Sequence, residues 1–359
     1  MEATDLSQLV KPSEFLRRIL QTYSVKALQN VLATLPIVGE DEYVYDDTSP
    51  DAGWRPGHLH WVPVGLERNN AGRIQLAGSP ENPIAERTVN ALEAMIEMAR
   101  QLELLAGNVP APASPKEAVR RYFELPPLAE VPRMKQLIKG RKPREHARDI
   151  ARKIRVRLLR DKEERQYTVQ IEDDGIGQTP ERMHSTLLSL GGSDKDDKPY
   201  LIGMFGQGGS STYAACEYSW IVSRRHPQLL GRGAAGIGWT AVKRVTVKGR
   251  RLTYFAYLAA HPDGRVPMLP ESAADEIGFA HGTRFAHVKY NFGTSEPAAT
   301  LYKSLNHLLF NPVLPFELYT GPERKADPMY GNGYRLSYDR EKMVVKDKGF
   351  LNQTVERGR

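Results

Sequence analysis

The sequence has almost no cysteine and no long apolar run. Cys216 is the single cysteine among 359 residues, which excludes an intramolecular disulfide and a metal site built from several cysteines. No apolar stretch approaches the roughly 18 residues needed to span a bilayer. The N-terminus, residues 1–5, lacks the basic and apolar pattern of a signal peptide. We therefore expect a cytoplasmic protein with no membrane partner.

Excess charge is also small, at a formal +7, but it is unevenly distributed. Hydrophobic residues make up 40% and charged residues 26%, which is typical of a globular protein. Basic side chains gather in the segment 133–165. Such a segment can contact the phosphates of a nucleic acid. An ordinary solvated helix and strand edge would carry the same charges, so both interpretations stay open.

Apolar periodicity predicts an α+β protein in which helices pack on one face of a mixed sheet. Alternating apolar residues over 153–159 and 167–171, joined by a turn at 161–165, predict a β-hairpin. The other expected strands are 60–64, 218–223, 239–247, 252–259 and 283–290. The expected helices are 13–35, 82–105, a short one within 106–132, 133–152, 179–190 and 210–216.

A short acidic and glycine-containing turn follows the second strand of that hairpin. It reads Asp173-Asp174-Gly175-Ile176-Gly177. A rigid carboxylate at a strand end can accept a hydrogen bond from an amino group of a base, including the exocyclic amine of adenine. Because aspartate and glycine are also the commonest turn residues, an ordinary turn explains this motif equally well when it is taken alone.

A glycine-rich segment, 203–209, precedes an expected helix that starts at Ser210. A glycine-rich turn at a helix N-terminus presents backbone N–H groups and a positive dipole end to an anion such as a phosphate. The segment is neither a Walker A loop, because no Gly-Lys-Ser/Thr follows, nor a dinucleotide fingerprint. A plain flexible loop is the rival interpretation.

Three polar side chains share one face of the helix expected over 82–105. Glu86, Asn90 and Glu93 are spaced by four and three residues. An amide oxygen and a carboxylate on one face can hold a magnesium ion and orient a water molecule. The solvated polar face of an amphipathic helix is the alternative.

These motifs, in this order, resemble those of the GHKL ATPase superfamily. That superfamily includes type II topoisomerase ATPase subunits, ninety-kilodalton heat-shock chaperones, MutL-type repair proteins, MORC proteins and sensor histidine kinases. The matching patterns are Glu86-x-x-x-Asn90-x-x-Glu93-Ala94, Asp173-x-Gly175-x-Gly177, Gly203-x-x-Gly206-x-Gly208 and, at the start of the last expected strand, Gly282-Thr283. The resemblance covers roughly residues 80–290.

The resemblance implies a Bergerat-type α/β sandwich that binds ATP and Mg²⁺ and hydrolyses ATP. Glu86 would be the general base, Asn90 the magnesium ligand, and Asp173 the acceptor for the adenine amine. The implied nucleotide-binding residues are Asn90, Asp173, Gly175, Gly177, Lys195, Gly203, Gly206, Gln207, Gly208, Gly209, Ser210 and Thr283. Lys198 is a second candidate for reaching a phosphate. ATP would close a lid and favour a homodimer, and hydrolysis would reset it.

Glu86 favours the topoisomerase, MutL, MORC and chaperone branch, because histidine kinases lack a water-activating glutamate at this place. One departure is the 83 residues between Asn90 and Asp173, a spacing longer than is usual in the family. We assign the excess to an insertion at about 106–150. A rival first motif near Glu145 restores the usual spacing, but it offers no asparagine for the metal position.

The expected organisation has three parts. Residues 1–80 form an N-terminal helical and loop region, a candidate dimerisation or regulatory arm. Residues 81–300 form the ATP-binding domain, and 301–359 begin a further domain of a longer protein. The basic segment favours an ATPase of a bacterial DNA-transaction or anti-phage defence system. An ATP-sensing interaction module with negligible turnover and a chaperone-like ATPase are the alternatives.

Overall fold

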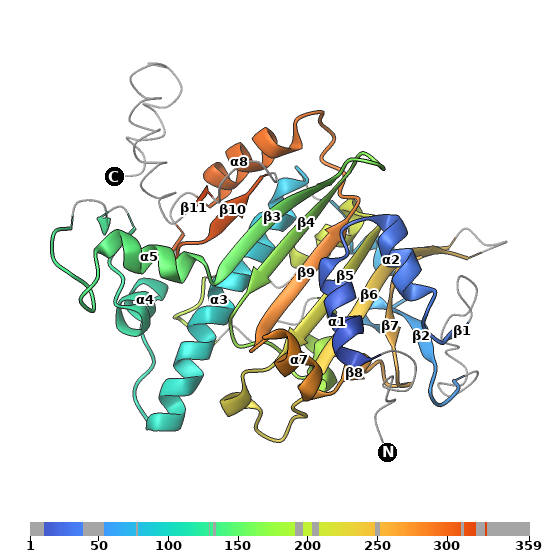
Figure 1. Ribbon diagram of the computed structural model, residues 1–359, viewed down its shortest axis with the longest axis horizontal. Coiled ribbons are helices and arrows are strands. Elements are labelled where there is room, and N and C mark those ends of the chain that lie inside the picture. Colours follow the sequence, from blue (N-terminus) through green and yellow to red (C-terminus); the bar gives the residue numbers. More distant parts are fainter. Residues whose placement is uncertain are drawn as a thin grey trace.

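The computed structural model describes residues 11–38, 54–76, 78–128, 130–131, 134–190, 197–202, 208–247, 252–309, 312–320 and 327–328. Within them, one mixed sheet of eleven strands forms the centre of the molecule (Figure 1). Its strands are β1 (Ile37–Val38), β2 (Leu59–Pro63), β3 (Ile154–Asp161), β4 (Gln166–Asp173), β5 (Tyr218–Arg224), β6 (Ile237–Thr246), β7 (Thr253–Ala259), β8 (Met268–Leu269), β9 (Gly282–Val288), β10 (Glu317–Tyr319) and β11 (Asp327–Pro328).

The strand order across the sheet is β1-β2-β7-β6-β5-β9-β4-β3-β10-β11, and β8 pairs with β6. The pairs β1–β2 and β3–β10 are parallel, and the other pairs are antiparallel. The mixed sheet and the α+β class expected from the sequence are therefore confirmed. So is the hairpin, which pairs Ile154 with Asp173 and Asp161 with Gln166.

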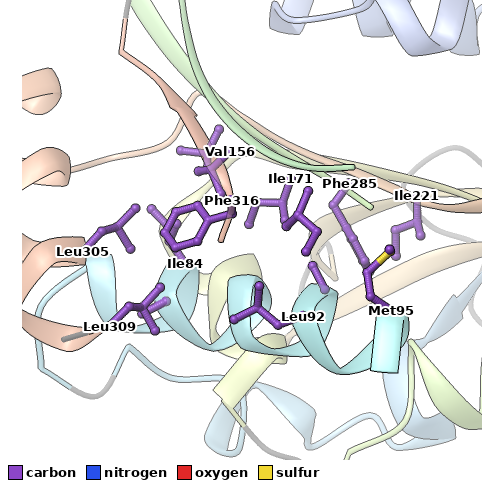
Figure 2. Close-up of a cluster of buried hydrophobic side chains, with 14 of the residues drawn as sticks. Ile84, Leu92, Met95, Val156, Ile171, Ile221, Phe285, Leu305, Leu309 and Phe316 are labelled. Atoms are coloured by element: carbon purple, nitrogen blue, oxygen red, sulfur yellow. The ribbon is translucent and has the colours of Figure 1, made fainter. Parts of the chain in front are cut away.

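One face of the sheet packs on the long helix α3 (Glu81–Ala106) and on α8 (Pro297–Leu308) (Figure 1). Figure 2 shows Ile84, Leu92 and Met95 of α3 pointing toward side chains of the sheet. The labelled partners in that core are Val156, Ile171, Ile221, Phe285 and Phe316, with Leu305 and Leu309 entering from the α8 side. This core explains why α3 carries an apolar stripe along its length.

The opposite face is also covered, by α1 (Pro12–Gln21), α2 (Val25–Leu32) and α7 (Glu271–Ile277). Phe15 of α1 lies against Trp239 of β6, with ring centroids 4.7 Å apart. The expectation that helices pack on one face only is therefore wrong. The physical reason is that β5, β6 and β7 are buried on both faces over most of their length, so the second face needs its own apolar cover.

Several expected helices are shorter than their patterns predicted. The helix expected over 13–35 is two helices, because Ser24 caps α2 by accepting a hydrogen bond from the N–H of Ala27. The helix expected over 179–190 is a 3-10 turn, Pro180–Arg182, followed by α6 (Met183–Thr186). The segment expected as a helix over 210–216 is a 3-10 helix, Gly208–Ala215.

The expected insertion contains α4 (Pro115–Phe123) and α5 (Pro143–Ala151), both at the left in Figure 1, with α4 beside the C-terminal part of α3. It is not wholly peripheral, because Val119 and Leu125 join the core beneath α3. The N-terminal region is likewise continuous with the rest, since β2 pairs with β7 in the central sheet. None of the helices in the described part of the chain combines the length and apolar character needed to cross a membrane.

Candidate functional site

Asp173 is the last residue of β4, and its carboxyl group is buried at the edge of the α3 face. Its Oδ1 accepts a hydrogen bond from the backbone N–H of Gly175 at 2.9 Å, and the carboxyl also accepts one from the backbone N–H of Thr283. The Arg284 guanidinium donates to the backbone oxygen of Asp173 and, at 2.5 Å, to Oδ1 of Asp174. The carboxyl is thus fixed by its neighbours, as a recognition group requires.

Burial raises the pKa of Asp173 from its ordinary 3.8 to about 7. The positive charge of Arg284 and the two backbone N–H donors act in the opposite direction but do not offset the desolvation. A buried carboxyl group with a pKa near neutrality is costly to keep in a fold. Such groups are concentrated at functional sites.

Two glycines allow the Asp173 turn to pack tightly between α3 and β5. Gly177 has φ +61°, and a Cβ there would lie 1.9 Å from the carbonyl oxygen of Arg224. A Cβ on Gly175 would lie 2.7 Å from the backbone and side chain of Ala94. The two glycines of the motif are therefore required by close approach and, at Gly177, by the left-handed backbone as well.

Hydroxyl groups line the strand ends beside this turn. Thr283 Oγ1 and Ser223 Oγ lie 3.0 Å apart, and Ser223 Oγ accepts a hydrogen bond from the N–H of Gln178 at 2.8 Å. These contacts join β5, β9 and the segment after Gly177. Sequence reasoning selected Thr283 but missed Ser223, whose position across from Thr283 depends on the β5–β9 register.

Two histidines pack against the same turn. The His226 and His281 rings lie 4.6 Å apart, and His281 Nδ1 donates to the carbonyl oxygen of Gly175 at 2.8 Å. The backbone N–H of His226 donates to Ile176 at 2.9 Å. Burial, then the nearby His281 and Arg225, lowers the pKa of His226, so a neutral ring is favoured there.

Helix α3 brings the first motif of the resemblance to the Asp173 turn. The carbonyl oxygen of Ala94 accepts a hydrogen bond from the N–H of Ile176 at 3.0 Å. Asn90 lies one helical turn before Ala94, and Glu86 one turn before Asn90, and both of these side chains are exposed. The 83-residue separation in sequence therefore does not separate the two motifs in space.

The end of the glycine-rich segment also reaches α3. A Cβ on Gly209 would lie 3.4 Å from Nδ2 of Asn90 and from the guanidinium of Arg87. Gly209 is followed by Ser210 within the 3-10 helix that begins at Gly208. Lys195, Gly203, Gly206 and Gln207, which the resemblance also implicates, lie outside the described residues.

Arg87 is a buried cation that sequence reasoning missed. Its guanidinium lies 4.1 Å from the ring centroid of Phe285 and 5.3 Å from that of Tyr213, and it donates to Thr212 Oγ1 at 3.4 Å. Among the described residues, no carboxylate forms a salt bridge with it. Its positive charge therefore lies beside Gly209, where it raises the local electrostatic potential.

Two carboxylates of α3 hold the segment 197–202 against the helix. Glu93 Oε1 accepts a hydrogen bond from the N–H of Ile202 at 2.7 Å. Glu97 pairs with Lys198 at 2.9 Å and accepts a hydrogen bond from the Tyr200 hydroxyl at 2.9 Å. Lys198, the second candidate for a phosphate contact, is thus engaged with a carboxylate in this conformation.

Part of the positive charge of segment 133–165 is balanced within the fold, where four arginines share two carboxylates. Arg155 and Arg157 both pair with Glu172, at 2.9 and 3.3 Å. Arg141 and Arg152 pair with Asp149, at 2.5 and 3.4 Å. These ion pairs reduce the field that this segment offers to a polyanion.

Comparison of the sequence with protein-family models and with curated proteins gives no match. No group of three or more His, Cys, Asp or Glu residues within the described ranges could hold a metal ion. A magnesium ion bound mainly through substrate phosphates and one amide oxygen does not require such a group.

Proposed function

We propose that this protein binds ATP with Mg²⁺ and hydrolyses it at a GHKL-type site of Bergerat architecture. One observation carries the proposal: α3 presents Asn90 beside Gly209 and, one turn later, Ala94 against the Asp173 turn. A buried carboxyl for a base and Gly209, at the end of the glycine-rich segment, are thereby placed along one helix.

The residues present fit both groups that the proposal invokes. The Asp173 carboxylate accepts a hydrogen bond from the adenine amine, while Gly175 and Gly177 let the turn pack against α3 and β5 and so fix the position of that carboxylate. Gly208, Gly209 and Ser210 offer backbone N–H groups to phosphates at the start of the 3-10 helix. The amide oxygen of Asn90 is a ligand of the type that Mg²⁺ prefers.

Glu86 is the proposed general base. It lies one turn from Asn90 on the exposed side of α3, so its carboxylate can accept a proton from a water molecule placed near the terminal phosphate. A bound magnesium ion would supply charge neutralisation to the phosphates. We further propose that ATP binding favours a homodimer, by closing the segments that flank the glycine loop.

Substitution Glu86→Gln tests the hydrolytic part of the proposal. Loss of a general base lowers turnover by roughly 100- to 10,000-fold, while the dissociation constant for ATP should change little. The matched control is Glu145→Gln, an exposed glutamate on α5 at the rival position for the first motif. Phosphate release and isothermal titration calorimetry measure the two quantities.

Three outcomes decide between the candidate functions. Lost turnover in Glu86→Gln with normal turnover in Glu145→Gln supports the proposal. Normal turnover in Glu86→Gln with lost turnover in Glu145→Gln would place the general base on α5 and contradict the proposal. ATP binding without measurable turnover in the unmodified protein favours the alternative, an ATP-sensing module.

A further inference from the structure

A buried, positively charged side chain lies between α3 and the 3-10 helix that follows the glycine-rich segment. It belongs to Arg87, which is only 6% exposed. Arginine is almost never this deeply buried unless its charge is paired. Arg100, which is also buried on α3, pairs with Glu103 at 2.6 Å. Arg87 forms no such ion pair within the part of the chain that the structure describes, where its printed contacts are a hydroxyl and two aromatic rings.

The titratable groups around Arg87 do not supply the missing negative charge. Its guanidinium lies between the rings of Tyr213 and Phe285, and Figure 2 shows Phe285 pointing from the sheet toward α3. Burial raises the pKa of the Tyr213 phenol, and burial raises the pKa of the Cys216 thiol to about 12. Burial, followed by the charge of Arg87, lowers the pKa of His287 well below 6.5. All three groups are therefore uncharged near pH 7.

A chain of hydrogen bonds connects Arg87 to the start of the 3-10 helix. Nε and Nη2 of Arg87 donate to Thr212 Oγ1, at 3.4 Å each. Thr212 Oγ1 in turn donates to the carbonyl oxygen of Gly209 at 2.7 Å. Because a hydroxyl has only one proton and this one goes to Gly209, Thr212 can only accept from Arg87. The direction of each bond in the chain is therefore fixed.

This chain orients the peptide unit between Gly209 and Ser210. In a planar trans peptide the N–H points opposite to the C=O. Holding the Gly209 oxygen toward Thr212 therefore directs the N–H of Ser210 toward the N-terminal end of the 3-10 helix, the end that favours an anion. The charge is close to the same point, because a Cβ on Gly209 would lie 3.4 Å from the Arg87 guanidinium and from Nδ2 of Asn90.

We propose that Arg87 is a positioning residue for phosphate binding, which aligns the backbone through Thr212 and Gly209 and attracts the phosphates through its charge. This role rests on the proposed ATP site, because it takes the phosphates to lie at the start of the 3-10 helix. A bound polyphosphate would then supply the negative charge that the described residues around Arg87 do not. Arg87 should accordingly determine how strongly the site prefers ligands with more phosphates, without affecting recognition of the base.

Isothermal titration calorimetry with adenosine, ADP and ATP tests this role on the full chain. Arg87→Met keeps the apolar length of the side chain but removes its charge and its donors. ATP affinity should therefore fall about tenfold or more, ADP affinity should fall less, and adenosine affinity should stay within about twofold. Arg87→Lys retains the charge, so it should restore ATP affinity to within about fivefold of the unmodified protein. Thr212→Val removes the linking hydroxyl and should weaken ATP binding about 2- to 10-fold, again without effect on adenosine.

The matched control is Arg100→Met, the same substitution at the other buried arginine. Arg100 lies about 20 Å from Arg87 along the axis of α3, at about 1.5 Å per residue. The change removes the ion pair with Glu103, so it should lower the melting temperature. The ratio of ATP affinity to adenosine affinity should nevertheless equal that of the unmodified protein. A general loss of stability therefore does not imitate the expected effect of Arg87→Met.

Three results would overturn the proposal. They are an equal loss of adenosine and ATP affinity in Arg87→Met, an unchanged ATP affinity in Arg87→Met, and an ATP affinity in Arg87→Lys as low as in Arg87→Met. Inorganic tripolyphosphate with Mg²⁺ separates this proposal from the ATP proposal, because it contains no base. Tripolyphosphate binding that is lost in Arg87→Met, in a protein that binds no ATP, would contradict the ATP proposal and support this one. ATP binding with the same ratio of ATP to adenosine affinity in Arg87→Met would do the opposite.

Discussion

Replacing the buried carboxyl of Asp173 should make the protein more stable and, at the same time, less able to bind ATP. The native pKa of about 7 lies above the ordinary 3.8, so the folded state binds more protons than the unfolded state between these values. Stability therefore falls as the pH rises from about 4 to 7. The total fall in the free energy of unfolding, complete above pH 7, is about 4 kcal/mol.

The variant Asp173→Asn removes this titration. Between pH 5 and pH 8 the unmodified protein should lose about 2 to 3 kcal/mol of unfolding free energy relative to the variant. Asparagine also sacrifices part of the hydrogen bonding to Gly175 and Thr283, but that loss is the same at both pH values and cancels from the difference. Urea unfolding of both proteins at pH 5 and pH 8 measures this difference in the free energy of unfolding.

ATP affinity should change in the opposite direction. A hydrogen bond to an ionised acceptor contributes about 1.5 to 3 kcal/mol, so at pH 8 the variant should bind ATP about 10- to 150-fold more weakly. In the unmodified protein, affinity should be roughly tenfold lower at pH 6 than at pH 8, because the ionised carboxyl is the binding form.

Asp161→Asn, a partly exposed change at the other end of the hairpin, is the control and should show no such pH-dependent gain. Two results would contradict these predictions for Asp173→Asn. One is an equal effect of Asp173→Asn on stability at pH 5 and pH 8, which would mean that the carboxyl has no raised pKa. The other is ATP binding by the variant at the unmodified affinity.

Two further predictions concern the packing of the site. Gly177→Ala should lower the free energy of unfolding in urea by about 3 kcal/mol or more, because it combines a left-handed backbone with a Cβ 1.9 Å from the Arg224 oxygen. The control Gly231→Ala, at φ +58° with nothing within 4 Å, should lower it by only about 1 to 2 kcal/mol. Equal losses in the two variants would count against close packing at Gly177. Arg87→Met should leave stability within about 1 kcal/mol, because a buried charge is often replaced without loss, but it should weaken ATP binding measured by calorimetry. Unchanged ATP affinity in that variant would exclude a role for the Arg87 charge at the phosphates.

The sequence was sufficient to predict the parts of the fold that depend on local pattern. The alternation of apolar residues at Ile154, Val156 and Leu158 predicted the hairpin. The glycines of the Asp173 turn indicated a tight backbone, and the structure shows that glycine is required there. The second helical layer was missed, although the continuous apolar runs of β5 to β7 already indicate strands buried on both faces.

Other features depend on contacts between distant segments and leave little local trace. Arg87 looks like one more basic residue on a polar helix face until Phe285 and Tyr213 surround it. The pairing of Lys198 with Glu97 joins residues 101 positions apart.

We propose that Asp173 and Asn90 belong to one ATP site. A crystal structure of the protein with a non-hydrolysable ATP analogue and Mg²⁺ tests it most directly. We expect the adenine amine within hydrogen-bonding distance of the Asp173 carboxylate and the metal on the amide oxygen of Asn90. A bound analogue whose adenine lies away from the Asp173 turn, or whose metal is held without Asn90, would contradict it.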